Sequence, residues 1–262
     1  MAASLRGSPG IALGDVVGAN VAIYLVALGV GGLDRAAAVP GRGDALRSAR
    51  LPLGAVTAWF VWDGEVGRAE GAVLVALYVA YVGAIWWMER KPSALGEVGE
   101  LAEARDAAGS GRPARVGRDL ALVLAGVAAM AGGATLLVEA VQRISGVEAT
   151  QTRLGLTLVG FATGFELVVL AWSAARRGIS EAVVSGVVGS FAYNATMTLG
   201  AGALARPMVL ADVALLHVPV LLMLASLALV VVLAARRGQL GRPESVVLLA
   251  AYPVFVVWVL LA

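Results

Sequence analysis

Eight long apolar runs constrain the possible folds of this chain more than any other feature. A helix needs about 20 mostly apolar residues to cross the ~30 Å hydrocarbon core of a bilayer. The runs cover residues 11–32, 51–62, 69–88, 120–141, 154–174, 180–204, 210–234 and 244–261. Only 15% of the residues are charged, whereas a soluble domain carries about 25%. The sequence therefore predicts an all-α polytopic membrane protein with about eight transmembrane helices.

The second run is unusually short. As a helix, residues 51–62 would extend over only ~18 Å, which does not span a bilayer core. We expect this helix to begin earlier, near Leu46, with the long side chains of Arg47 and Arg50 reaching the membrane interface.

The loops between the runs alternate in charge. Loops 33–50, 89–119, 175–179 and 235–243 together hold fifteen Lys and Arg residues, and loops 63–68, 142–153 and 205–209 hold four. Because cytoplasmic loops are enriched in Lys and Arg, we expect the first set in the cytoplasm and both termini outside. Loop 89–119 is interpreted as a cytoplasmic linker between two membrane halves, 1–88 and 120–262. The expected location is a prokaryotic plasma membrane.

Several kinds of function lack the residues that they need. The chain has no cysteine and a single histidine, His217, so thiolate chemistry and a His-rich metal site are not expected. Glycine-rich phosphate loops, catalytic triads and basic patches with aromatic residues are also absent from the sequence. We therefore expect no enzyme activity, no cofactor and no nucleic-acid partner. The sequence leaves the oligomeric state open.

The segment from Gly160 to Asn194 carries the main candidate functional residue, Glu166. Glu166 lies twelve residues into its run, ~18 Å from the outer end, and Asn194 lies fourteen residues into the next run, ~21 Å from the inner end. Both positions fall near the middle of the bilayer. A carboxylate at that depth is costly and by default marks an ion or substrate pathway. The i, i+3 and i, i+4 spacings place Thr163 on the face of Glu166 and Ser190 on the face of Asn194.

Residues 1–33 are similar to residues 172–204 at a constant offset of 171. Ten positions are identical without a gap, including an Arg-Gly pair and a Val-Val-Gly motif at the same spacing. According to the loop charges, the two helices cross the bilayer in opposite directions. Inverted repeats are typical of secondary transporters, which bind their substrate near the midplane where the repeats meet. The sequence thus predicts an incomplete pair of inverted repeats, with the complete second repeat at 151–204.

The first repeat has no counterpart of the acidic helix 154–174, because Met1 aligns with Trp172. From this we expect that the chain is truncated or has a misassigned start, and that an acidic helix precedes Met1. An upstream reading frame without an apolar segment that carries a midplane acid would contradict this expectation.

At these residues the chain resembles the calcium/cation antiporter superfamily, which includes the sodium/calcium and cation/proton exchangers. Its members have two inverted repeats, each pairing a G-T-S-x-P-E helix with a G-N-x-x-G-S-N-x-x-N helix. The family fold has ten helices, of which eight would be present here. The resemblance implies a secondary active cation antiporter that works by alternating access, as the two inverted halves rock around a midplane site.

The match to the two motifs is partial. The residues that match the motifs are Gly14, Gly18, Asn20, Thr163, Glu166, Gly189, Ser190 and Asn194. The residues that replace an expected asparagine, serine or proline are Asp15, Ala19, Ile23, Phe165 and Phe191. The loss of oxygen donors suggests fewer bound ions, or a different ion.

The resemblance implies an ion-binding site for calcium, sodium or a proton. Its candidate residues are Glu166, Thr163, Ser190, Asn194, Asp15 and Asn20, with Glu166 and Asn194 as hypothetical metal ligands. Calcium takes six to eight oxygen ligands and favours more than one carboxylate. A calcium site would therefore need the absent acidic helix, whereas a sodium or proton site would not.

The candidate residues can also have a purely structural role instead of binding an ion. Glu166 can be a protonated or hydrogen-bonded buried acid, and Ser190 and Asn194 can join neighbouring helices. For Asp15 the favoured interpretation is an interfacial acid at a helix N-terminus. The alternative to an antiporter is a degenerate membrane scaffold or sensor that keeps the exchanger fold without transport. In either case the expected partners are the lipid bilayer and inorganic cations.

Overall fold

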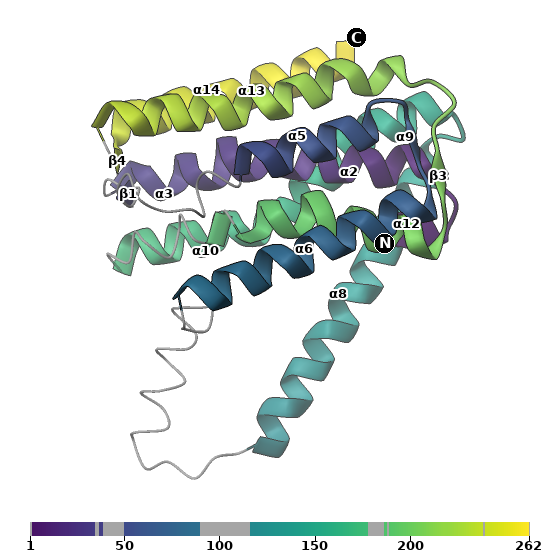
Figure 1. Cartoon of the computed structure of the whole chain (residues 1–262), viewed down its shortest axis with the longest axis horizontal. Helices are drawn as coiled ribbons and strands as arrows, with labels where there is room; N and C mark the ends of the chain where they lie inside the picture. The colour runs from purple at the N-terminus through teal and green to yellow at the C-terminus, as the bar shows by residue number, and fades with distance from the viewer. Residues whose placement is uncertain are drawn as a thin grey trace.

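The chain folds into a bundle of membrane-length helices (Figure 1). The computed structural model describes residues 2–34, 37–38, 50–89, 116–177, 186–187, 189–237 and 239–261. Within these ranges, six helices are long and apolar enough to cross a membrane: Pro9–Leu33, Arg68–Trp87, Leu120–Ile144, Glu148–Arg177, Ala214–Leu233 and Arg242–Leu261. Helical residues 186–187 and 189–205 and the shorter helix Pro52–Val61 correspond to the other two predicted segments. The prediction of an all-helical polytopic membrane protein is confirmed.

The elements follow the predicted runs closely. The α-helices are α1 (Ala2–Leu5), α2 (Pro9–Ala22), α3 (Leu28–Asp34), α5 (Arg50–Val61), α6 (Arg68–Glu89), α8 (Val116–Ile144), α9 (Glu148–Leu154), α10 (Gly160–Arg177), α12 (Leu199–Ala205), α13 (Ala214–Arg237) and α14 (Arg242–Leu261). Three π-helical segments, η1 (Ile23–Ala27), η2 (Gly155–Val159) and η3 (Tyr193–Thr198), join consecutive helices. The short strands are β1 (Ala37–Ala38), β2 (Glu65–Val66), β3 (Met208–Val209) and β4 (Gln239–Leu240).

Two sequence expectations fall partly or wholly on residues outside the described ranges. The expected start of α5 near Leu46 lies outside them, and so does most of the linker 89–119, since the structure resumes at Val116. From Arg50 to Val61, α5 is ~18 Å long.

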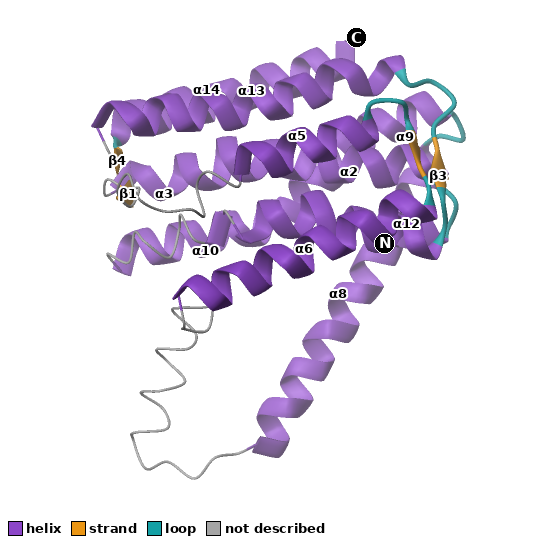
Figure 2. Cartoon of the chain, in the orientation of Figure 1, coloured by secondary structure: helices purple, strands orange, loops and turns teal. Residues whose placement is uncertain are grey.

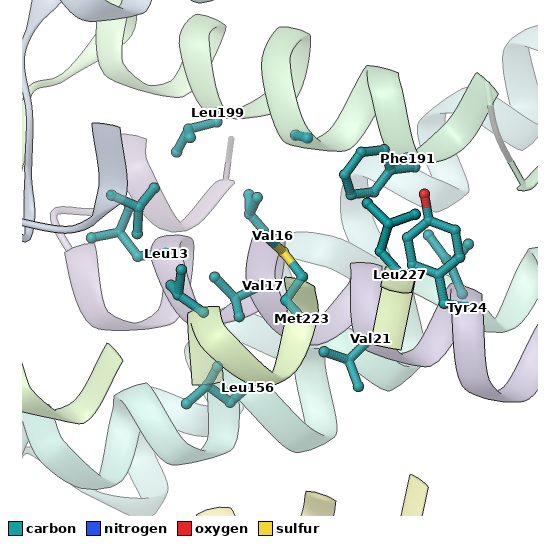
Figure 3. Packing of buried hydrophobic residues seen from close by; sticks show 14 of the residues in the cluster. Leu13, Val16, Val17, Val21, Tyr24, Leu156, Phe191, Leu199, Met223 and Leu227 are labelled. Atoms are coloured by element: carbon teal, nitrogen blue, oxygen red, sulfur yellow. The ribbon is translucent and has the colours of Figure 1, made fainter. Parts of the chain in front are cut away.

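The first long helix forms the centre of the bundle. In the span Pro9–Leu33, 83% of the residues in its most apolar window are buried. Figure 3 shows Val16, Val17 and Val21 of α2 among buried side chains from other helices, including Leu156 and Met223. A helix that is apolar on all sides is expected in such a position, and here α2 packs against α9, η2, α10 and α13.

Glycine allows α2 to approach the span Glu148–Arg177 at backbone distance. A Cβ atom built on Gly14 would lie 2.7 Å from the backbone oxygen of Thr152. A Cβ atom on Gly18 would overlap the backbone oxygen of Leu156, and one on Gly160 would lie 2.6 Å from the backbone nitrogen of Ala19. Membrane helices associate through such close packing of small residues, since lipid provides no hydrophobic driving force between them.

Helix α8 leaves the bundle over most of its length (Figure 1). All described side chains from Leu120 to Ala134 are exposed, and burial begins only near the end of the helix, at Val138 and Val141. Within the described part of the chain, the first two thirds of α8 therefore present their apolar side chains to the surroundings on every side.

Two small antiparallel ladders, which we call the clips, lie at opposite ends of the bundle (Figure 2). The first clip pairs β1 with β4, and the second pairs β2 with β3. Near the first clip the Arg242 guanidinium donates a hydrogen bond of 3.0 Å to the Leu33 carbonyl. At the second, the Leu210 amide donates one of 2.9 Å to the Gly64 carbonyl. Each clip joins residues before position 89 to residues after position 116.

The clips follow the internal repeat of the sequence. Adding 171 to the residue numbers of β1 gives those of β3, and adding 174 to those of β2 gives those of β4. The same offset of 171 carries η1, residues 23–27, onto residues 194–198 of η3. These correspondences agree with the predicted inverted repeat, although the assignment of residues 1–88 and 120–262 as two halves stays a prediction.

Candidate cation-binding site

The close crossing of α2 and α10 brings Asp15 to Thr163. The Thr163 hydroxyl group donates a hydrogen bond to the Asp15 carboxyl group. The second carboxyl oxygen, Oδ1, is buried and has no hydrogen-bond partner within the described residues. The sequence interpretation of Asp15 as an interfacial acid at a helix N-terminus did not include this contact with α10, and its depth in the membrane stays a prediction. Its side chain faces another membrane helix because Gly14 and Gly18, one residue before and three after it, allow that helix to come close.

Glu166 lies near the middle of the span Glu148–Arg177, as the sequence predicts, but its side chain is exposed. Its neighbours on this side of α10 are apolar and also exposed, with exposed fractions of 49% for Phe165 and 46% for Val169. Thr163 is exposed as well and lies one turn before Glu166. The carboxylate thus projects from the described bundle at bilayer depth, and the interpretation of Glu166 as a buried acid is wrong.

The helical segment 189–205 places Ser190 and Asn194 at half-buried positions. Asn194 lies in η3, where its Oδ1 accepts a hydrogen bond of 3.4 Å from the Thr198 hydroxyl. Within the described residues, no hydrogen bond or ion pair joins Glu166 to Ser190 or Asn194. The structure therefore brings Asp15 to Thr163, but it does not gather all six predicted residues around one point.

Phe191 fills the position where the motif expects an asparagine. Its exposed fraction is only 1%, and its ring lies 5.1 Å from the ring of Tyr24, tilted by 47° (Figure 3). This aromatic contact between η1 and the helical segment 189–205 fills the bundle centre with hydrocarbon where an amide ligand was expected.

Asn20 is the most deeply buried polar residue of the predicted set. Its side chain is fully buried, and neither its Oδ1 nor its Nδ2 has a hydrogen-bond partner among the described residues. Buried amides are nearly always hydrogen-bonded, so an unpartnered one requires a specific explanation. A bound cation or an ordered water would satisfy the amide oxygen.

Sequence reasoning missed one polar contact at this centre. The Thr57 hydroxyl of α5 lies 2.9 Å from the Leu53 carbonyl oxygen and 3.0 Å from the Ala195 carbonyl oxygen in η3. A π-helical turn alters the regular backbone pairing, and such turns are frequent at functional sites. Thr57 thereby connects α5 to the turn that carries Asn194. A threonine within an apolar run was the only sequence signal for this role.

The described residues contain no group of three or more His, Cys, Asp and Glu side chains that could enclose a metal ion. The acidic groups at bilayer depth are Asp15 and Glu166, on different helices. Their neighbours supply hydroxyl and amide oxygens, which suit hard cations.

Comparisons with known proteins agree with this fold. The family model described as sodium/calcium exchanger protein matches residues 1–87 and 119–261. The inner membrane protein YrbG of Escherichia coli K12 is 26% identical over 269 residues, covering 98% of this chain and 78% of that protein. The uncharacterized membrane protein MJ0091 of Methanocaldococcus jannaschii is 26% identical over 188 residues, covering 70% of this chain and 55% of that protein.

A solved structure of the sodium-calcium exchanger NCX_Mj, soaked with sodium and calcium, superposes with a TM-score of 0.66 at 22% identity. The superposition covers 97% of this chain and 78% of that one, and it shows a shared fold. The family model spans nearly the whole chain in two blocks. The chain therefore belongs to the sodium/calcium exchanger protein family, a class of integral membrane cation antiporters.

Proposed function

We propose that this protein is a secondary active antiporter that exchanges inorganic cations across a prokaryotic plasma membrane, without catalysing a chemical reaction. The observation that carries the proposal is the position of Glu166, a carboxylate near the middle of a membrane span in an exchanger-family fold. A charged carboxylate at the centre of a bilayer costs about 3 kcal/mol or more. A cation that binds there offsets this cost, and the Thr163 hydroxyl, one turn before Glu166 on the same helix, offers a further oxygen ligand.

Exchange follows from competition for one negative group. A carboxylate that is too costly to leave uncompensated in the membrane can change sides readily only with a cation bound. Release of one cation on one side must then be followed by capture of another. The transported ions in this proposal are sodium, calcium or a proton, and the energy comes from the gradient of one of them.

The clips limit how alternating access can occur. Each clip pairs a segment before position 89 with a segment after position 116. Residues 1–88 and 120–262 are also interlocked by helix packing, because α6 packs against α12 and α14 against α3. We infer that the moving boundary does not run between these two halves, since their separation would break one clip or the other. The expected rocking of the two halves as rigid bodies is revised accordingly.

The proposed orientation places loop 89–119 in the cytoplasm and both termini outside. The clips support it, because each joins two loops that the charge pattern assigns to the same side. Loops 33–50 and 235–243, both rich in arginine, meet at the first clip, and loops 63–68 and 205–209 meet at the second.

Flux measurements in proteoliposomes test the proposal. The purified protein is expected to take up sodium or calcium against an opposing gradient of sodium, calcium or protons. Glu166→Gln should abolish the counter-flow because it removes the charge and keeps the shape. Asp212→Asn serves as the control, since Asp212 is exposed and lies just before α13. Absence of flux in every gradient would refute the proposal and leave a non-transporting scaffold or sensor.

A further inference from the structure

Asp15 occupies a position that none of the exchanger motifs assigns to a carboxylate. It lies six residues after the start of α2 at Pro9, about 9 Å along the helix. At that depth the carboxylate is inside the bilayer, in the half nearer to the proposed outer surface. Its neighbour Thr163 comes from α10, so two helices of opposite repeats contribute to the contact.

The carboxyl group of Asp15 has fewer hydrogen-bond partners among the described residues than it can accept. Its Oδ1 is buried, and no group of the described chain donates to it. The two carboxyl oxygens can accept about four hydrogen bonds or ligand contacts, and Thr163 provides one. Unsatisfied buried oxygens at bilayer depth mark the place where a cation would be most favourable.

The Thr163 hydroxyl can serve both the empty and the occupied state. A hydroxyl group has one hydrogen to donate and two lone pairs that accept. In the structure it donates to Asp15. With a cation between the two side chains, rotation about the C–O bond turns a lone pair toward the cation, and the carboxylate binds the cation directly.

Charge balance selects a monovalent cation. Asp15 contributes one negative charge, and the described residues contain no cluster of three or more acidic or histidine side chains. A divalent cation would leave one positive charge uncompensated in a medium of low dielectric constant, where unpaired charges are most costly. Glu166 does not complete this balance in the observed structure, because its side chain projects from the exposed surface of α10.

We infer that Asp15 and Thr163 form a binding position for a monovalent cation, sodium, at the crossing of α2 and α10. This inference rests on the proposed antiport function and adds a carboxylate that the family motif does not provide. It also accounts for the apolar residues Ile23 and Phe191 at positions where amides were expected. Both apolar side chains are buried in the bundle centre, and the oxygen atoms of the proposed position lie nearer to the start of α2 instead.

Sodium binding to the purified full-length protein tests the inference. The measurement is the thermal stabilisation by sodium chloride, with choline chloride used to hold the ionic strength constant. The wild type should be stabilised by sodium. Asp15→Asn should lower the apparent sodium affinity about tenfold or more, since it removes a charged ligand. The Asp212→Asn variant should behave as the wild type.

Thr163 provides variants that do not change the charge of the protein. Thr163→Val should weaken sodium binding, and Thr163→Ser, which keeps the hydroxyl group, should restore it. This pair keeps the test valid if Asp15→Asn does not fold. Wild-type affinity for sodium in Asp15→Asn or in Thr163→Val would overturn the inference, and so would a wild type that sodium does not stabilise.

Transport assays separate this inference from the proposed function. Calcium counter-transport that depends on Glu166 but is indifferent to sodium and to Asp15→Asn would retain the antiporter and overturn the sodium position. Sodium binding that depends on Asp15, in a protein without flux in any gradient, would retain the sodium position and refute antiport.

Discussion

The crossing of α2 with the span Glu148–Arg177 makes a quantitative prediction at Gly18. A methyl group at this position would overlap the Leu156 carbonyl oxygen, a backbone atom that cannot move by rotating a side chain. Gly83 on α6 is the matched control, since a Cβ atom there has no neighbour within 4 Å. Both glycines lie within membrane helices, so Gly→Ala changes the helix propensity by the same amount at each.

Replacing glycine by alanine within a helix stabilises the helix by about 0.5–1 kcal/mol at either site. At Gly83 this gain should appear alone, so Gly83→Ala should be slightly more stable than the wild type. At Gly18 an over-packing penalty of about 1–3 kcal/mol opposes it. The two variants should therefore differ by this penalty, which corresponds to about 2–12 °C in Tm at 2–4 °C per kcal/mol.

Intrinsic tryptophan fluorescence during heating in detergent measures this difference, since the chain has six tryptophans. The wild type and both variants are compared at the same protein and detergent concentrations. If Gly18→Ala melts at or above Gly83→Ala, the helices do not approach at backbone distance, and the reasoning that places Thr163 against Asp15 fails with it.

Three further predictions address the bundle centre and the orientation. Phe191→Ala should lower the free energy of unfolding by about 3–5 kcal/mol because it leaves a cavity beside Tyr24, whereas Phe165→Ala, at a 49% exposed site, should have a much smaller effect in the same melting assay. Thr57→Val keeps the shape and removes the hydroxyl contact to η3, which should cost about 1 kcal/mol; an unchanged Tm would contradict that contact. Because the chain has no cysteine, Val209→Cys should react with a membrane-impermeant maleimide on intact cells and Arg242→Cys only after permeabilisation; the reverse pattern would invert the proposed topology.

The helices and their order could be predicted from the sequence because lipid imposes the length and polarity of each segment. The apolar runs that predicted the spans leave little choice, since backbone groups in hydrocarbon must pair within a helix. The family fold followed from the same runs together with the repeat and the partial motifs. The contacts between helices were harder to predict, because the apolar faces of such a helix cannot be told apart in the sequence.

The candidate site illustrates that limit at individual residues. The depth of Glu166 was predictable from its distance to the helix end, but its exposure depends on which helices pack beside α10. The contact of Asp15 with Thr163 was not predictable for the same reason, since a place near the start of α2 does not indicate which helix packs beside it. The sequence did contain a relevant signal, since Gly14 and Gly18 on one helix and Gly160 and Gly164 on the other share a spacing of four.

The central position of α2 has a consequence for the biogenesis of this protein. The span Pro9–Leu33 is synthesised before the span Glu148–Arg177, which packs against it and ends only at Arg177. Ribosomes add about 5–20 residues per second, so translation from Asp34 to Arg177 takes on the order of ten seconds. Throughout that interval a nascent chain would carry Asp15 and Asn20 into the membrane without their eventual neighbours. Until the later helices insert, contact with the translocon, with an insertase or with water keeps these two polar side chains out of the lipid.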